Sequence, residues 1–301
     1  MRSFRLIFSG LCLIAALAAL SAAVICLLNP HRAELYLLDI FSIPLTSAVL
    51  AMTILLILLR QKWPAIVSVM ASLVFLISVW PQAMPSQAPP DPSAPAVRAM
   101  FANLLIRNMT PENLLPWVAA QKPDVIALVE VNNFVNQTLL DGLRPTYPYQ
   151  FVRYDMVVAS RYPLLKPERH PAGFALLTAT IKAPSGDIRL AVAHLTRPWP
   201  FSADQPTQMA RLSQALRTQA NTRFILVGDF NTAPSAVLIN DLKRALNLHS
   251  AGAYNGTWPS FLPGFGRVTI DNAFASQDIN LSRRRTGPFN GSDHRPIVVD
   301  I

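Results

Sequence analysis

The stretch FILVGDFN, residues 224–231, joins a short apolar run to a polar turn. The run has the length and composition of a buried strand, and a carboxylate and an amide lie at its end. Two more apolar runs end in the same way: residues 124–129 are followed by Glu130, and residues 188–193 by His194. Because strand ends in a layered sheet structure converge on one rim, these polar groups predict one shared site.

These residue types suit the cleavage of a phosphoester. A phosphodiester is anionic and resists attack, so a hard divalent cation held by carboxylate oxygens is needed to neutralise its charge, and Glu130 is the candidate ligand. Asp229 can organise the attack of water, with the Asn231 amide fixing the phosphate or the water. His194 and His294 can donate hydrogen bonds to phosphoryl oxygens or transfer protons, because imidazole titrates near neutrality.

A further motif, Ser-Asp-His at 292–294, lies close to the C-terminus. Asp271 can orient His294 and stabilise its charged form, as carboxylates do in catalytic triads. Each motif alone also has a structural explanation: Gly-Asp-Phe-Asn makes a common turn, Glu130 can be a solvated strand end, and His194 a satisfied histidine at the edge of a core. Their order, each beside an apolar run, favours the functional interpretation.

This order of motifs resembles the endonuclease/exonuclease/phosphatase superfamily, which includes pancreatic-type deoxyribonucleases, abasic-site nucleases, sphingomyelinases and inositol-polyphosphate phosphatases. The resemblance covers roughly residues 98–301, about the length of one domain. It implies an α/β fold, a four-layered α/β sandwich of two mixed β-sheets flanked by helices, with a divalent-metal site. The residues that carry it are Asn103, Glu130, His194, Gly228-Asp229-Phe230-Asn231, Asp271 and Ser292-Asp293-His294.

The resemblance also implies a role for each of these residues. Glu130 would be the main metal ligand, with Asn103 and Asp293 beside it, and the ion would be Mg²⁺ with Mn²⁺ as the alternative. The catalytic set would comprise His194, Asp229, Asn231, Asp271 and His294. One departure is Leu105, at a place where some nucleases of the superfamily carry an acidic residue, so a single metal ion is expected.

Candidates for substrate binding are Trp258, Arg283 and Arg284. A tryptophan near this position often walls the substrate pocket in the superfamily, and Trp258 could stack on a base or cover a sugar, although a core aromatic is the alternative. The arginine run could grip a phosphate backbone or a lipid headgroup, but a solvated loop is the commoner meaning of such a run. Residues 82–301 contain 21 Lys and Arg against 15 Asp and Glu, and this basic balance favours anionic partners, with general solubility charge as the alternative.

Three apolar segments precede this domain, at about residues 6–28, 43–59 and 65–80. Each approaches or exceeds the roughly 17 to 25 residues that cross a bilayer, and none carries an internal charge, so they predict three transmembrane helices. The same lack of charge argues against a transporter. A cleaved signal peptide at residues 1–23 is the alternative for the first segment, although its apolar run is longer than usual.

Basic residues predict the orientation in the membrane. Arg2 and Arg5 precede the first segment, and Arg60 and Lys62 lie between the second and the third. This count places the N-terminus in the cytoplasm, and an odd number of spans then carries the C-terminal domain across. The expected location is a bacterial inner (plasma) membrane, multi-pass, with the domain in the periplasm or outside.

The expected organisation is a membrane anchor at 1–80, a Pro-rich linker at 81–97 and a catalytic domain at 98–301. The linker composition predicts a semi-rigid spacer that would hold the domain up to some tens of ångströms from the bilayer. The elements predicted for the domain include strand 97–105, helix 111–121, strands 125–129, 156–160 and 175–181, helix 205–220, a strand from 224 and helix 236–245.

These observations predict a membrane-anchored, divalent-metal-dependent phosphoesterase that hydrolyses phosphodiester bonds on the non-cytoplasmic side. Its substrate would be either nucleic acid or a phospholipid headgroup, and the sequence leaves this choice open. The alternative is a catalytically inactive, membrane-tethered binding protein on the same fold, which Leu105 in place of the acidic residue would explain.

Overall fold

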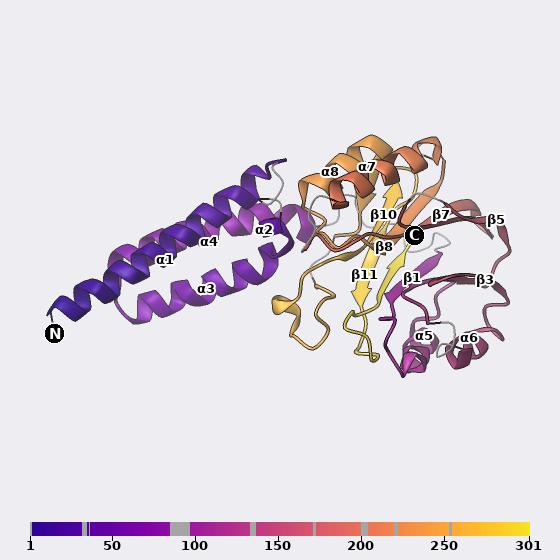
Figure 1. The fold of residues 1–301 in the computed structure, drawn as a ribbon, viewed down its shortest axis with the longest axis horizontal. Helices are drawn as coiled ribbons and strands as arrows, with labels where there is room; N and C mark the ends of the chain where they lie inside the picture. Colours follow the sequence, from indigo (N-terminus) through magenta and orange to yellow (C-terminus); the bar gives the residue numbers. More distant parts are fainter. Residues whose placement is uncertain are drawn as a thin grey trace.

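In the computed structural model of this chain, an elongated bundle of helices leads into a layered α/β domain (Figure 1). The structure describes residues 2–31, 35, 37–84, 97–132, 137–170, 173–199, 204–219, 222–252 and 255–301. For Arg2 and Arg283 it describes the backbone alone. Most of the predicted Pro-rich linker, residues 85–96, lies outside the described residues.

The N-terminal helices are α1 (Arg2–Leu28), α2 (Leu37–Ile40), α3 (Ser42–Leu58) and α4 (Lys62–Ala83). Among the described residues, α1 and α4 are long and apolar enough to cross a membrane, whereas α3 is apolar but has 17 residues. At 1.5 Å per residue, α3 is about 26 Å long, a few ångströms less than the roughly 30 Å hydrocarbon core. The prediction of three spans is therefore corrected to two candidate spans, with α3 packed beside them.

The three long helices form one packed unit, in which α1 and α3 both lie against α4. Ala23, Val49 and Phe75 are buried at the centre. The Thr53 hydroxyl lies 2.6 Å from that of Ser68, so this polar pair is satisfied inside the bundle. Small and hydroxyl-bearing residues allow close helix contact where the surroundings are apolar.

The domain contains two mixed six-stranded sheets. Sheet A has the order β11-β12-β1-β2-β4-β3 and is built from β1 (Arg98–Asn103), β2 (Val125–Val129), β3 (Tyr149–Arg153), β4 (Met156–Ser160), β11 (Ser282–Thr286) and β12 (Ile297–Asp300). Sheet B has the order β5-β6-β7-β8-β10-β9 and is built from β5 (Leu164–Arg169), β6 (Ala175–Ala183), β7 (Gly186–His194), β8 (Phe224–Asp229), β9 (Leu248–Ser250) and β10 (Asp271–Ser276). In each sheet one central pair is parallel, β1 with β2 and β7 with β8.

Apolar side chains between the sheets form the central core, which includes Phe101, Val158 and Val227. The outer face of sheet A is covered by η1 (Pro111–Leu114), α5 (Leu115–Gln121) and α6 (Gln137–Leu143), and that of sheet B by α7 (Asp204–Leu216) and α8 (Val237–Leu246). Helix, sheet, sheet and helix are thus the four layers, and the predicted α/β sandwich is confirmed.

Most predicted elements lie within two residues of the observed ones. The strands at 125–129 and 156–160 agree at both ends. The predicted strand to 105 instead ends at Asn103, because Leu105 has a positive φ of 59° and its N–H bonds the Asn103 side chain. The chain turns there into the site described below.

The bundle packs directly on the domain. The Asn29 side chain, after α1, donates to the Ser235 carbonyl and accepts from the Val237 N–H, at the start of α8. Asp39 of α2 accepts a hydrogen bond of 2.7 Å from the Ser235 hydroxyl, and Ile40 is buried beside the domain. These contacts hold the domain at the end of the bundle, whereas the semi-rigid spacer stays a prediction because most of it lies outside the described residues.

Candidate functional site

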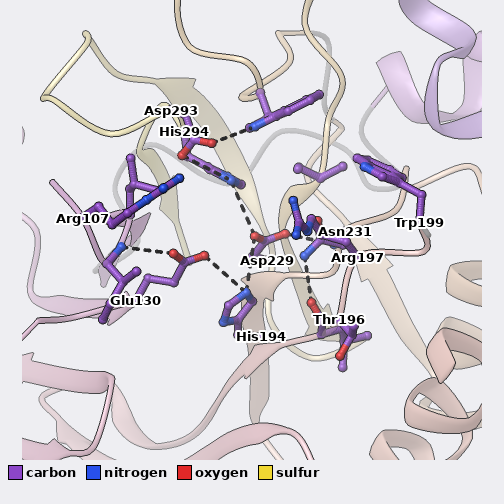
Figure 2. A pocket seen from close by; sticks show the side chains of 15 residues that line it. Arg107, Glu130, His194, Thr196, Arg197, Trp199, Asp229, Asn231, Asp293 and His294 are labelled. Atoms are coloured by element: carbon purple, nitrogen blue, oxygen red, sulfur yellow. Dashed lines mark hydrogen bonds and ion pairs between the residues drawn. The ribbon is translucent and has the colours of Figure 1, made fainter. Parts of the chain in front are cut away.

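The polar residues predicted from the sequence lie at one rim of the sandwich (Figure 2). In sheet B, His194 at the end of β7 pairs with Asp229 at the end of β8, which pairs with Asp271 at the start of β10. In sheet A, Asn103 is the last residue of β1, and Glu130 directly follows β2. Side chains from both sheets therefore meet at the same place.

The Asn103 side chain joins the two sheets at the site. Its amide nitrogen donates one hydrogen bond of 2.9 Å to Glu130 Oε1 and one of 3.0 Å to Asp229 Oδ2. Asn103 and Asp229 are buried, whereas the Glu130 side chain is about a quarter exposed. One neutral amide thus holds two carboxylates close together, which their mutual repulsion would otherwise oppose.

His294 lies between the carboxylates of Asp271 and Asp229. Its Nδ1 is 2.9 Å from Asp271 Oδ2, and its Nε2 is 3.8 Å from Asp229 Oδ2. The Ser292 hydroxyl donates to the Asn103 carbonyl and accepts the His294 N–H, so it fixes the motif against β1. The arrangement leaves Nε2 as the ring atom turned toward the pocket.

A tight turn after β8 shapes the nucleophile side of the site. The Asn231 N–H donates a hydrogen bond of 2.9 Å to Asp229 Oδ1. Asn231 also has a positive φ of 49°, which asparagine tolerates well. The Asn231 amide also donates to the Leu195 carbonyl, after β7. The turn thereby aligns the ends of β7 and β8.

Burial and neighbouring charges shift the acid–base behaviour of these groups. Burial raises the pKa of Asp229, and the Asp271 charge raises it further. Burial lowers the pKa of His294, but the charges of Asp271 and Asp229 outweigh this and raise it overall. Glu130 keeps a lowered pKa despite burial, because the Asn103 amide and His194 stabilise its charge. A charged His294 beside a proton-accepting Asp229 suits acid–base catalysis.

His194 lies on the opposite side of the carboxylates from Asp271. Its Nε2 is 3.6 Å from Glu130 Oε1 and 3.9 Å from Asp229 Oδ2, and its side chain is one-fifth exposed. These separations are longer than hydrogen bonds. The ring can therefore turn a nitrogen toward an anion in the pocket.

The donor set fits a hard divalent cation. Glu130, Asp229 and Asp293 line one pocket, and Asp293 Oδ1 is a buried oxygen that has no hydrogen-bond partner among the described residues. Asp229, Asp271 and His294 also lie close enough together to share an ion, but His294 Nδ1 already faces Asp271 Oδ2. Oxygen ligands of this kind are those that Mg²⁺ prefers.

The pocket has a volume of about 380 Å³ and a mixed lining. Trp258, predicted as a substrate-binding residue, lines the pocket, and its indole N–H donates a hydrogen bond of 3.0 Å to Asp293 Oδ2. Trp199 lies beside Trp258, with ring centroids 6.1 Å apart. Arg107 and Arg197 also line the pocket, on either side of Asp229 (Figure 2). The pocket thus combines an aromatic wall with two exposed cations.

Of the two predicted arginines, Arg284 does not line the pocket. Its guanidinium is buried and donates to the Asp271 and Asn255 carbonyls, and this burial lowers its pKa to about 10. The Arg283 side chain lies outside the described residues. Sequence reasoning missed Arg107 and Arg197, although each follows a strand-end site residue by three or four positions. That spacing was the available signal.

Comparisons with known proteins agree with this geometry. Residues 100–294 match the Endonuclease/Exonuclease/phosphatase family. No curated protein matches the chain in sequence.

Several solved structures share the fold. Sphingomyelinase C from Streptomyces griseocarneus is 14% identical with a TM-score of 0.51, over 69% of this chain and 99% of that one. A humanized D. rerio TDP2 is 16% identical with a TM-score of 0.57, over 68% and 98%. A beta toxin variant from Staphylococcus aureus with bound magnesium ions is 14% identical with a TM-score of 0.54, over 68% and 99%.

Proposed function

Because the chain belongs to the endonuclease/exonuclease/phosphatase family, we propose that it is a divalent-metal-dependent hydrolase that cleaves phosphodiester bonds. The observation that carries the proposal is His294, which lies between Asp271 and Asp229 in a pocket that also contains Glu130. This set contains a base, a charged donor and a metal ligand, which are the parts that phosphoester hydrolysis needs.

In the proposed reaction, water attacks phosphorus and the bond from phosphorus to the leaving alcohol oxygen breaks. Asp229 takes a proton from the water, which its raised pKa favours. His294, kept charged by Asp271, donates a hydrogen bond to a phosphoryl oxygen. His194 gives a proton to the leaving oxygen and regains one from Asp229, 3.9 Å away.

Glu130, Asn103 and Asp293 would hold the metal ion, with Mg²⁺ as the expected ion and Mn²⁺ as the alternative. When bound, the ion neutralises charge on the phosphoryl group and on the leaving oxygen. Arg107 and Arg197 bind the remaining anionic oxygens of the substrate at the mouth of the pocket. Trp258 packs on the part of the substrate next to the phosphate.

The proposal includes a membrane anchor, in which α1 and α4 both run from the cytoplasmic side of a bacterial inner membrane toward the domain. Between them α3 leads the chain back alongside α4, so the domain lies on the non-cytoplasmic side. The N-terminal end of α1 and the turn between α3 and α4 lie at the end of the bundle away from the domain (Figure 1). Arg5, Arg60 and Lys62 belong to these two segments. Basic residues favour the cytoplasmic side, so this arrangement supports the orientation.

The test is hydrolysis of bis-p-nitrophenyl phosphate by the full chain in detergent, with Mg²⁺, Mn²⁺ or EDTA. We expect metal-dependent turnover that falls by about 100-fold or more in Asp229→Asn and in His294→Ala, since each removes a proton-transfer group. Asp187→Asn, an exposed change at the start of β7, should keep the wild-type rate.

A folded wild type with no turnover would contradict the proposal. It would favour a binding protein on the same fold, an alternative for which Leu105 is the specific observation. Leu105 lines the pocket where an acidic side chain would add a second metal contact.

A further inference from the structure

The aromatic wall of the pocket touches the N-terminal helices. Trp199 lies between Trp258 and Phe41, with ring centroids 6.1 Å from each. Phe41 lies between α2 and α3, whereas both tryptophans line the pocket. In Figure 2 a helix of the N-terminal part lies directly beyond Trp199. The pocket therefore opens beside the end of the bundle.

An apolar cluster fixes this position. Ile40 of α2 is buried against Val268 and Ile270, and Trp199 and Trp258 pack on the same cluster. Ile270 also lines the pocket. A change in the position of the helices would therefore reach the pocket wall through direct packing.

A second apolar feature, residues 261–265, lies beside α3. The Ser47 hydroxyl of α3 donates a hydrogen bond of 3.1 Å to the Phe265 carbonyl. Phe261 and Phe265 are 77% and 66% exposed, and Leu262 is 36% exposed. Large aromatic side chains that are exposed together at such a place usually mark an interaction surface.

The contact with α3 gives the depth of this loop. Ser47 is five residues after the start of α3 at Ser42, which corresponds to about 8 Å along the helix. Apolar groups of interfacial proteins enter the bilayer by a similar distance, about 5–10 Å. If α3 begins at the membrane surface, Phe265 lies at the level where headgroups meet acyl chains.

The loop is also joined to the catalytic motif. The Ser260 N–H donates a hydrogen bond of 2.7 Å to the Asp293 carbonyl, and the Ser260 hydroxyl donates one of 2.8 Å to the Ser292 carbonyl. Residues 261–265 therefore follow directly after a segment bonded to the motif of His294. A lipid beside the loop would have its phosphate within a short distance of the pocket.

We infer that residues 261–265 enter the bilayer beside α3, and that the pocket takes the phosphodiester headgroup of a lipid in the same leaflet. This inference rests on the proposed function and on the membrane anchor. The reaction is the hydrolysis described above: water adds to phosphorus, and the lipid-side or headgroup alcohol leaves with a proton. A nucleic acid would instead have to approach between the domain and the membrane, past exposed phenylalanines that offer its backbone no charge.

Depth in the membrane can be measured without any activity. In the full chain with Cys12 and Cys26 replaced by alanine, single spin labels at Phe261→Cys and Phe265→Cys are compared with one at Tyr149→Cys. Tyr149 is an exposed aromatic of β3, at the side of the domain away from the bundle (Figure 1). In vesicles, we expect the loop labels to be accessible to oxygen and protected from a water-soluble nickel complex, and the Tyr149→Cys label to show the opposite.

Activity is then measured on two substrates. The probes are bis-p-nitrophenyl phosphate in detergent, and equimolar phosphatidylcholine, phosphatidylethanolamine, phosphatidylglycerol and sphingomyelin in vesicles that hold the protein. The double variant Phe261→Ser/Phe265→Ser should keep the rate on the soluble diester within about twofold and lose about 10-fold or more on vesicle lipid, given the loss of apolar contact with the bilayer. Tyr149→Ser should change neither rate.

The outcomes separate the inference from the proposed function. Loop labels in water, or turnover of the soluble diester while vesicle lipid is not cleaved, would overturn the lipid assignment and leave the phosphodiesterase standing. Absence of turnover on every diester would overturn the proposed function, and the lipid assignment with it.

Discussion

At the scale of single residues, the site depends on how the Asn103 amide and His294 compensate buried carboxylates. Asp229 and Asp271 are both buried and lie near one another through the β8–β10 pairing. Asn103 donates to Asp229 on one side, and His294 lies 3.8 Å from it on the other. Glu130 and Asp293 add carboxylate charge at the mouth, which attracts a cation.

A metal ion should therefore stabilise the folded protein through Glu130. Mg²⁺ at about 100 times its dissociation constant adds about 2.7 kcal/mol to the free energy of unfolding, which raises the melting temperature. Glu130→Gln should lose most of this rise, because a neutral amide is a weaker ligand. The measurement is the melting temperature in detergent with EDTA and with Mg²⁺. Glu168→Gln, at an exposed position of β5, should respond like the wild type, and an equal rise in all three would rule out Glu130 as a ligand.

Two arginines should behave differently when they are removed. Arg197→Ala should raise KM by about 10-fold with an unchanged melting temperature, since an exposed cation that contacts only the substrate contributes about 1.5 kcal/mol. Arg284→Met should instead lower the free energy of unfolding by about 1–3 kcal/mol, because it removes the donor to the carbonyl of buried Asp271. Steady-state kinetics and thermal unfolding distinguish the two, and a KM effect of Arg284→Met without destabilisation would contradict its structural assignment.

At the scale of elements, the parallel pair β7 and β8 carries the geometry of the site. Residues 193–194 lie directly against Gly228 and Asp229. A Cβ at Gly228 would overlap the Ala193 carbonyl oxygen, which is backbone and cannot move aside. Glycine is therefore required here for close approach of the strands, and the position of Asp229 relative to His194 depends on it.

Gly228→Ala should accordingly lower both stability and turnover. We expect a loss of about 1–3 kcal/mol in the free energy of unfolding, the usual result of overpacking in a core. The rate on the soluble diester should fall with the protein fully folded, as judged by circular dichroism. Gly266→Ala is the matched control, since its Cβ would meet only ordinary contacts. Equal stability of the two variants would show that the strands can separate without loss.

At the scale of the whole molecule, the bundle and the domain are joined by contacts between distant parts of the chain. Asn29 and Asp39 bond the segment at 235–237, more than 190 residues later. Asp39 is buried at this junction, and burial raises its pKa to about 6, partly offset by the Ser235 hydroxyl. The junction therefore carries a charge that its surroundings disfavour.

The burial of Asp39 predicts a pH dependence of stability. Between about pH 4 and pH 6 the folded carboxyl binds a proton that the unfolded one has lost, so the free energy of unfolding falls as pH rises, by at most about 3 kcal/mol. Asp39→Asn should remove the part of this fall that is due to Asp39, and it should be more stable than the wild type near pH 7. Melting temperatures of the full chain across this range test it. Asp187→Asn should follow the wild-type curve, and a wild-type slope in Asp39→Asn would contradict the prediction.

How much could be predicted depended on whether a feature is local in sequence. The strands at 125–129 and 156–160 were predicted to the residue because each is a continuous buried run between polar residues. The apolar segment predicted at 43–59 agrees with α3 to within one residue, and its length of 17 residues is what leaves two candidate spans instead of three. The position of the domain was predicted from the composition of the linker, which says nothing about contacts made by Asn29 and Asp39.

The sequence by itself determined the family, the four-layered sandwich and the polar residues at the strand ends, because apolar runs and the groups that end them are local patterns. Only the tertiary structure decided that Arg107 and Arg197 flank the pocket while Arg284 is buried behind Asp271. It also decided that Phe41 packs on Trp199 at the pocket wall. The physical reason is that burial and contact depend on residues far apart in the chain, whose approach is set by the packing of the sheets and the bundle.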